Sequence, residues 1–210
     1  MARTGTRIFS DEYGGVLVEA AVMMPLFLVF VLGSIDFLMA MYQWNAATKA
    51  VQIGARIAAV SSPVASDLTT MTGLGGGVDP GEPMPSFTTT CDGATATCSD
   101  GGTFSSDALN TIVYGRGNGA TCTNTNNIYR RGMCNAFSRV APANVVITYT
   151  QTGLGYAGRP GGPVPTITVS LQNITFQYHF LRGILGFTNI TIPGLTTSIT
   201  GEDLSSSAPT

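Results

Sequence analysis

The 210-residue chain contains few charged residues and only one histidine. Charged residues make up 10% of the composition, the formal net charge is −2, and the ten lysines and arginines form no basic run. A nucleic-acid-binding domain normally gathers its positive charge in one patch or stripe. The composition therefore predicts no nucleic-acid partner.

Motifs of common enzyme and metal sites are also missing from the sequence. There is no G-x-S-x-G, no H-E-x-x-H and no C-x-x-C, and the loop acids lack the spacing of a calcium-binding loop. The single histidine, His179, falls on the polar face of a predicted strand, where we interpret it as a solvent-facing residue. We therefore expect no enzyme activity, no cofactor and no metal site.

Cysteine is absent from the apolar N-terminal part, and all four cysteines lie downstream of it: Cys91, Cys98, Cys122 and Cys134. An even number in one soluble region predicts two disulfides formed in an oxidising compartment. Three pairings are possible, and the sequence does not choose among them. We favour Cys91–Cys98 and Cys122–Cys134, because closure between nearest neighbours is easiest and Asp92-Gly93 offers a turn within the first pair.

One long apolar run, Val16–Ile35, dominates what the sequence does contain. About 20 helical residues, rising ~1.5 Å each, cross ~30 Å of hydrocarbon. The run is too long for a secretory signal peptide and no A-x-A cleavage site follows it, so we predict a membrane anchor. Arg3 and Arg7 precede the run, and the positive-inside rule then places the N-terminus in the cytoplasm and the cysteines outside.

The helix is expected to continue beyond the apolar run and to end at Ser61-Ser62-Pro63. Small and apolar residues recur there at steps of three and four, which places them on one helix face. The stripe includes Ala47, Ala50, Gly54 and Ile57. Such a stripe needs a partner, which is either the chain's own globular domain or a neighbouring helix.

The C-terminal third has the alternating pattern of β-strands. Predicted strands cover residues 145–150, 167–171, 174–180 and about 195–200. A short helix is expected over 105–114, capped by Ser105 or Ser106. Glycine and proline mark residues 72–86 and 153–165 as loops.

The predicted fold class is α+β, with a long N-terminal transmembrane helix followed by a mostly antiparallel β domain outside the cytoplasm. The helix is assigned to residues 15–62 and the domain to residues 63–200. Residues 201–210 are expected to form a flexible tail.

Two acids, Glu19 and Asp36, lie near the two ends of the apolar run. A charge at mid-bilayer costs ~2.5–3.5 kcal/mol on insertion scales and less near the interface, so either side chain could simply reach the headgroups. Glu19 has a second interpretation. A cut between Gly14 and Gly15 would create an α-ammonium four residues ahead of it, and in an assembly its carboxylate could pair with a neighbour's ammonium.

These residues resemble the start of TadE-like pseudopilins. Val18–Val29 is similar to that family's V-E-F-A-hydrophobic-P-L-L-L motif, except that Ala20 replaces the common aromatic. Gly33–Phe37 resembles its G-hydrophobic-hydrophobic-[E/D]-F motif, and Gly54–Ala59 resembles its closing G-A-R-x-A-A.

The resemblance implies a minor pilin of a Tad (tight adherence) type IV pilus, held in the bacterial inner membrane and taking part in pilus assembly, secretion and adhesion. Residues 1–14 would be a leader removed by a prepilin peptidase. Other implied partners are membrane lipid, further pilins and an inner-membrane platform with a cytoplasmic ATPase.

Within this interpretation, Glu19, Pro25, Gly33 and Asp36 are the expected assembly residues, and the small-residue stripe would pack against other pilin helices. Pro25 and Gly33 would loosen or kink the helix in the bilayer. The alternative is a permanently anchored envelope protein whose outer domain binds a ligand or scaffolds a complex.

Overall fold

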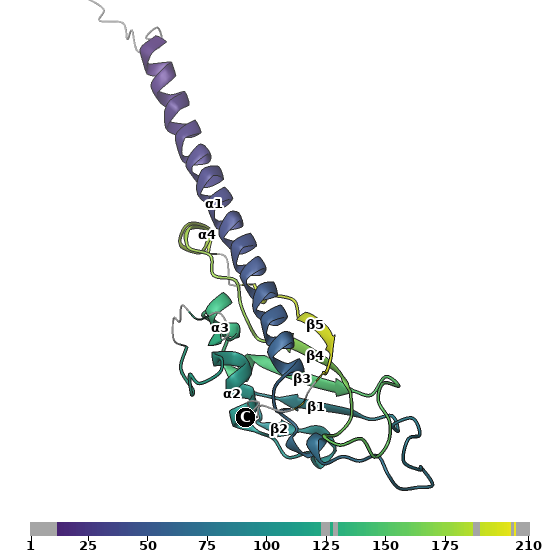
Figure 1. The fold of residues 1–210 in the computed structure, drawn as a ribbon. Coiled ribbons are helices and arrows are strands. Elements are labelled where there is room, and N and C mark those ends of the chain that lie inside the picture. Colours follow the sequence, from purple (N-terminus) through teal and green to yellow (C-terminus); the bar gives the residue numbers. More distant parts are fainter. Residues whose placement is uncertain (1–11, 123–126, 128–129, 187–189, 203, 205–210) are drawn as a thin grey trace, which may run out of the picture. The chain divides into compact units, whose positions relative to one another are not determined.

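The computed structural model describes residues 12–122, 127, 130–186, 190–202 and 204 (Figure 1). Backbone contacts divide the chain into two units. The first combines the N-terminal residues up to Tyr42 with Gln177–Ile190, and the second combines Gln43–Phe176 with the C-terminal residues from Thr191. We call these the helix unit and the sheet unit.

Helix α1 covers Glu12–Ala59, a single α-helix of 48 residues (Figure 1). At ~1.5 Å per residue it is about 72 Å long. It passes without interruption through Pro25, which lacks the N–H that would complete one backbone hydrogen bond. The predicted long helix is thus confirmed. Its first half belongs to the helix unit and residues 43–59 belong to the sheet unit.

The sheet has five antiparallel strands in the order β2-β1-β3-β4-β5. They are β1 (Thr88–Asp92), β2 (Thr97–Cys98), β3 (Val145–Thr150), β4 (Thr166–Leu171) and β5 (Leu195–Thr200). The last three confirm predicted strands, whereas β1 and β2 were not predicted. Three of the five residues in β1 are threonines with no apolar alternation, so period two gave no signal there.

One face of the sheet forms the core. Alternating residues of the central strands, such as Ile147, Tyr149 and Val169, are 0% exposed. They share one hydrophobic cluster with residues from α1 and from α2 (Ser106–Tyr114). The intervening threonine and serine residues of β3 and β4 are half-buried on the opposite face. The period of two therefore decides which residues meet the helices.

The predicted short helix is confirmed as α2. Its N-cap is Ser105, whose side chain accepts a hydrogen bond from the N–H of Ala108 at 3.3 Å. Gly115 ends the helix with φ of 94°, a value that favours glycine. Further short helices among the described residues are η1 (Ser66–Thr69), η2 (Ser99–Gly101), α3 (Met133–Ala136) and η4 (Pro142–Asn144).

The strand predicted over 174–180 is wrong. Thr175 forms only an isolated bridge with Thr191, and the chain then enters helix α4 (Phe180–Leu185). His179 is therefore exposed at the N-cap of α4 and not on a strand. Asn173, with φ of 56°, turns the chain out of β4 at the point where the apolar pattern changes phase.

The structure describes three residues of the expected flexible tail, Gly201, Glu202 and Leu204. The N–H of Gly201 donates to the carbonyl of Pro165 at 2.8 Å, and that of Glu202 donates to Ala59 at 3.0 Å. Leu204 is 5% exposed and joins the core. Residues 203 and 205–210 lie outside the described part, as do residues 1–11 of the expected leader.

Candidate functional site

The first half of α1 is apolar and exposed. Within the described residues, α1 is the one helix long and apolar enough to cross a membrane by length and composition, and its most apolar window has a mean hydropathy of 2.4. Val16 is 64% exposed, Phe27 61% and Tyr42 71%. Removing apolar surface of this kind from water lowers the free energy by roughly 25 cal/mol per Å², so this surface is consistent with membrane anchoring.

Glu19 lies exposed on this apolar surface, two turns after the start of α1. Among the residues that the structure describes, none forms a hydrogen bond or an ion pair with its carboxylate. Gly14 and Gly15 lie in the first turn, and a Cβ added at either would meet no atom within 4 Å. The helix start therefore presents an acid that the described part of the chain does not satisfy.

Pro25 and Gly33, which are expected to loosen or kink the helix, both lie within the continuous helix α1. Gly33 has a second feature. A Cβ built at this position would lie 3.5 Å from Cδ2 of Leu181, which is ordinary van der Waals contact. Gly33 therefore lies beside the start of α4, within the same unit.

Asp36 is 0% exposed and is satisfied by its own chain. Its Oδ1 accepts the N–H of His179 at 3.0 Å, and its Oδ2 accepts those of Phe180 and Leu181 at 2.9 and 2.7 Å. These are backbone donors at the start of α4, which have no partner within that helix. A charge-assisted hydrogen bond is stronger than a neutral one, so Asp36 is a firm attachment point.

The small-residue stripe is occupied by the sheet unit. Ala47 and Ala50 are 0% exposed and belong to the main hydrophobic cluster. Gly54 is buried and Ile57 is half-buried against the same cluster. A Cβ built on Gly54 would lie 2.6 Å from the sulfur of Met133, which shows how closely the domain approaches this helix face. The expectation that the stripe packs against other pilin helices is therefore corrected: the chain's own domain covers it.

The opposite face of this half of α1 is polar. Its exposed side chains follow steps of three and four residues and are Asn45, Lys49, Gln52 and Arg56. Both charged members are basic. We call these four residues the polar stripe.

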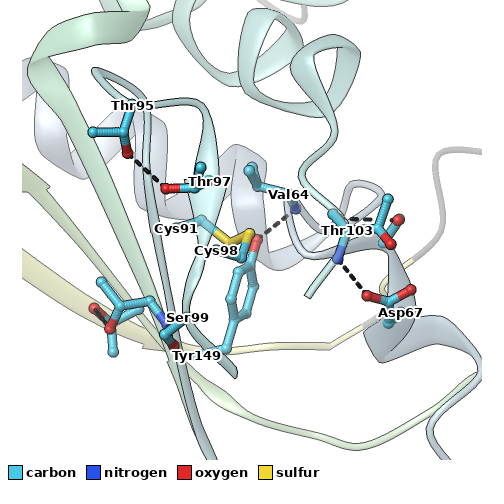
Figure 2. The surroundings of a disulfide bond; sticks show 12 residues. Val64, Asp67, Cys91, Thr95, Thr97, Cys98, Ser99, Thr103 and Tyr149 are labelled. Atoms are coloured by element: carbon cyan, nitrogen blue, oxygen red, sulfur yellow. Dashed lines mark hydrogen bonds between the residues drawn. A yellow bond between two sulfur atoms is a disulfide. The ribbon is translucent and has the colours of Figure 1, made fainter. Parts of the chain in front are cut away.

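Both favoured disulfides are present in the structure. Cys91–Cys98 joins β1 to β2 at directly opposed positions, and Cys122–Cys134 joins the loop after α2 to α3. Figure 2 shows Tyr149 beside the first disulfide, with its hydroxyl accepting the N–H of Val64 at 2.8 Å. Burial raises the pKa of the Tyr149 hydroxyl well above its usual range.

A polar contact that the sequence did not reveal fixes residues 43–59 of α1 within the sheet unit. The guanidinium of Arg139 donates to Oε1 of Gln43 at 2.7 Å and also to the carbonyl of Thr175. Trp44 stacks on Phe176, with 6.4 Å between ring centroids. The residues involved are far apart in sequence, so the sequence alone did not pair them.

The comparisons with known proteins found a match that covers parts of both halves of α1. Residues 14–56 match the family model described as TadE-like protein. The resemblance found in the sequence is therefore confirmed over that segment, which lies entirely within α1. No curated protein and no solved structure matches the chain. The family match implies a protein associated with the Tad pilus, in a pilin-type family that is generally not enzymatic.

Proposed function

We propose that this protein is a minor pilin or pseudopilin of a Tad pilus, whose α1 enters an assembly of pilin helices and whose outer domain is carried on it. The observation that supports this most is the TadE-like match, which falls on a helix bearing an unsatisfied acid, Glu19, on an exposed apolar surface. A solitary anchor gains nothing from a charge placed there, because the charge costs insertion free energy.

Processing would supply the missing partner. Cleavage between Gly14 and Gly15 by a prepilin peptidase on the cytoplasmic side would create an α-ammonium at the helix start. Residues four apart share a helix face, so the ammonium and Glu19 would form one charged face. In an assembly, the ammonium of one subunit would pair with Glu19 of the next and would set the register between them.

The two halves of α1 would then make different contacts. Because the small-residue stripe is covered by the chain's own domain, contacts to other pilins would involve the exposed apolar half and, outside the membrane, the polar stripe. In this proposal Asp36 attaches α4, while Glu19 pairs between subunits.

The protein would sit in the bacterial inner membrane with its N-terminus in the cytoplasm and the disulfide-bonded domain outside. It would act with other pilins and with an inner-membrane platform driven by a cytoplasmic ATPase, in filament assembly, secretion and surface adhesion. The two disulfides support an oxidising compartment for the domain.

Replacing the acid tests this function. We expect Glu19→Ala to insert in the membrane and to keep a folded domain while filament biogenesis is lost. Met23→Ala is the matched control, because Met23 lies one turn further along the same exposed surface and is 68% exposed. Normal filaments in the Glu19→Ala strain, at wild-type protein level, would reject the proposal.

A further inference from the structure

The segment between β4 and β5 makes an excursion that the pilin interpretation does not use. Thr175 bridges Thr191, and the N–H of Ile192 donates to the carbonyl of Ile174 at 2.6 Å, so the excursion leaves and returns at one place. We call residues 177–186, which include α4, the arm. The arm belongs to the helix unit and not to the sheet unit.

The arm is attached to α1 at a defined depth. Three backbone N–H groups of the arm donate to the Asp36 carboxylate, and Leu181 lies in contact distance of the Gly33 position. Asp36 comes 20 residues after Val16, which is about 30 Å along a helix. If the apolar span starts at Val16, Asp36 and the arm lie where the hydrocarbon of the outer leaflet ends.

The apolar surface of α1 continues beyond this point. Phe37 is 60% exposed, Leu38 66% and Met41 47%. From Val16 to Tyr42 the exposed apolar surface is about 40 Å long, which matches a whole bilayer including its headgroup regions. Asp36 therefore sits inside that length, where a carboxylate without hydrogen bonds would be costly.

The arm itself has the side chains of an interfacial segment. Phe180 is 39% exposed and Arg182 is exposed, and Ile190, which follows the arm in the same unit, is 55% exposed. Aromatic and aliphatic side chains enter the acyl boundary while arginine extends to the phosphates. This combination fits lipid better than it fits water.

We propose that the arm is a second membrane contact, an interfacial element that docks on lipids of the outer leaflet and is held at that depth by Asp36. Lipid is the expected partner of the arm, because exposed apolar residues of α1 lie on both sides of Asp36. An unpaired Asp36 would oppose insertion, but here its carboxylate caps the start of α4. This inference does not depend on filament formation, since it concerns the single chain in a bilayer.

Fluorescence quenching by lipids brominated high on the acyl chain tests the proposal on the full chain in vesicles. Trp44 is the only tryptophan, so Trp44→Phe provides a silent background that keeps an aromatic ring against Phe176. Phe180→Trp then reports on the arm. Phe27→Trp, in the apolar half, is the positive reference, and Tyr156→Trp, at an exposed position of the sheet unit, is the negative one.

We expect the reporter at position 180 to lose about half or more of its emission to brominated lipid, and the one at position 156 to lose less than about a tenth. Equal quenching at positions 180 and 156 would overturn the proposal. Protection of position 180 from both brominated lipid and aqueous acrylamide would also overturn it, because another protein surface would then cover the arm.

Releasing the attachment gives a second readout. In Asp36→Ala, quenching at position 180 should fall by at least about half while quenching at position 27 stays unchanged. Asp36→Asn is the matched control, because its amide oxygen keeps an acceptor and should retain part of the quenching. If Asp36→Ala leaves the quenching at position 180 unchanged, Asp36 does not hold the arm at the membrane.

Discussion

Both halves of α1 carry apolar residues, but the first half exposes them and the second half buries them. Up to Tyr42 the helix presents large side chains such as Phe27 and Leu38, which are more than 60% exposed. From Gln43 onward its apolar residues are mainly alanine, and Ala47 and Ala50 are fully buried. The difference lies in side-chain size: small residues let a domain approach the helix closely, whereas large ones offer area to lipid.

The largest effect on stability is expected from a charge placed on the buried face of α1. Ala50→Asp should destabilise the sheet unit by about 3–5 kcal/mol, because an uncompensated charge would lie in the core. Gln52→Asp, two residues away on the exposed face, should change stability by less than about 0.5 kcal/mol. Thermal unfolding followed by Trp44 fluorescence measures both. Similar melting temperatures for the two variants would show that the domain does not pack on this face.

Removing a disulfide should destabilise the sheet unit and leave the helix unit unaffected. Replacing Cys122 and Cys134 together by serine should cost about 2–4 kcal/mol of domain stability, since the bond restricts the unfolded chain. Membrane insertion of α1 should be unchanged, because all four cysteines lie in the sheet unit. Carbonate extraction and thermal melting of the double variant, compared with wild type, measure the two effects separately. Release of the double variant from the membrane would contradict the division.

Tyr149 makes the stability of the sheet unit depend on pH. Tyr149→Phe should cost about 1–3 kcal/mol, because the buried N–H of Val64 loses its acceptor. In the wild type, burial raises the pKa of Tyr149, so above pH ~10 the folded chain holds a proton that the unfolded chain has lost. The contribution of Tyr149 to stability should therefore be constant below that pH and fall as pH rises past it, by up to about 1.4 kcal/mol per pH unit.

Chemical unfolding at a series of alkaline pH values checks this sign. Tyr149→Phe removes the titrating group and should lose its share of the slope. An identical slope in both proteins would mean that other tyrosines or lysines cause the alkaline loss.

The smallest effect is expected in the apolar half. Phe27→Ala removes a large side chain, but because Phe27 is 61% exposed it should leave the melting temperature of the sheet unit unchanged within error. In the core, a substitution of the same kind costs about 3–5 kcal/mol. A clear loss of domain stability in Phe27→Ala would show that the two units are not energetically independent.

The elements that were predicted correctly are those determined by residues close to one another in the chain. The α1 run, the caps at Ser105 and Gly115 and the alternation in β3 and β4 all depend on neighbours in the chain. The arm was missed because its helix is short and its backbone donors are satisfied by Asp36, 143 to 145 residues away. An acid at the edge of an apolar run followed much later by Phe-Leu-Arg-Gly was the available hint, but only the fold pairs them.

The sequence also did not determine which surface covers the small-residue stripe. Periodicity identified the face that includes Ala50 and Gly54, but it could not distinguish a partner helix from the chain's own sheet. The disulfide pairing was favoured for chain proximity, and the register of Cys91 against Cys98 agrees with it.

The N-terminus of the chain within purified filaments tests the central claim most directly. Intact-mass measurement should give a chain that begins at Gly15, as cleavage between Gly14 and Gly15 requires. A filament-associated chain that still carries residues 1–14 would contradict the account and would leave a permanently anchored envelope protein in its place.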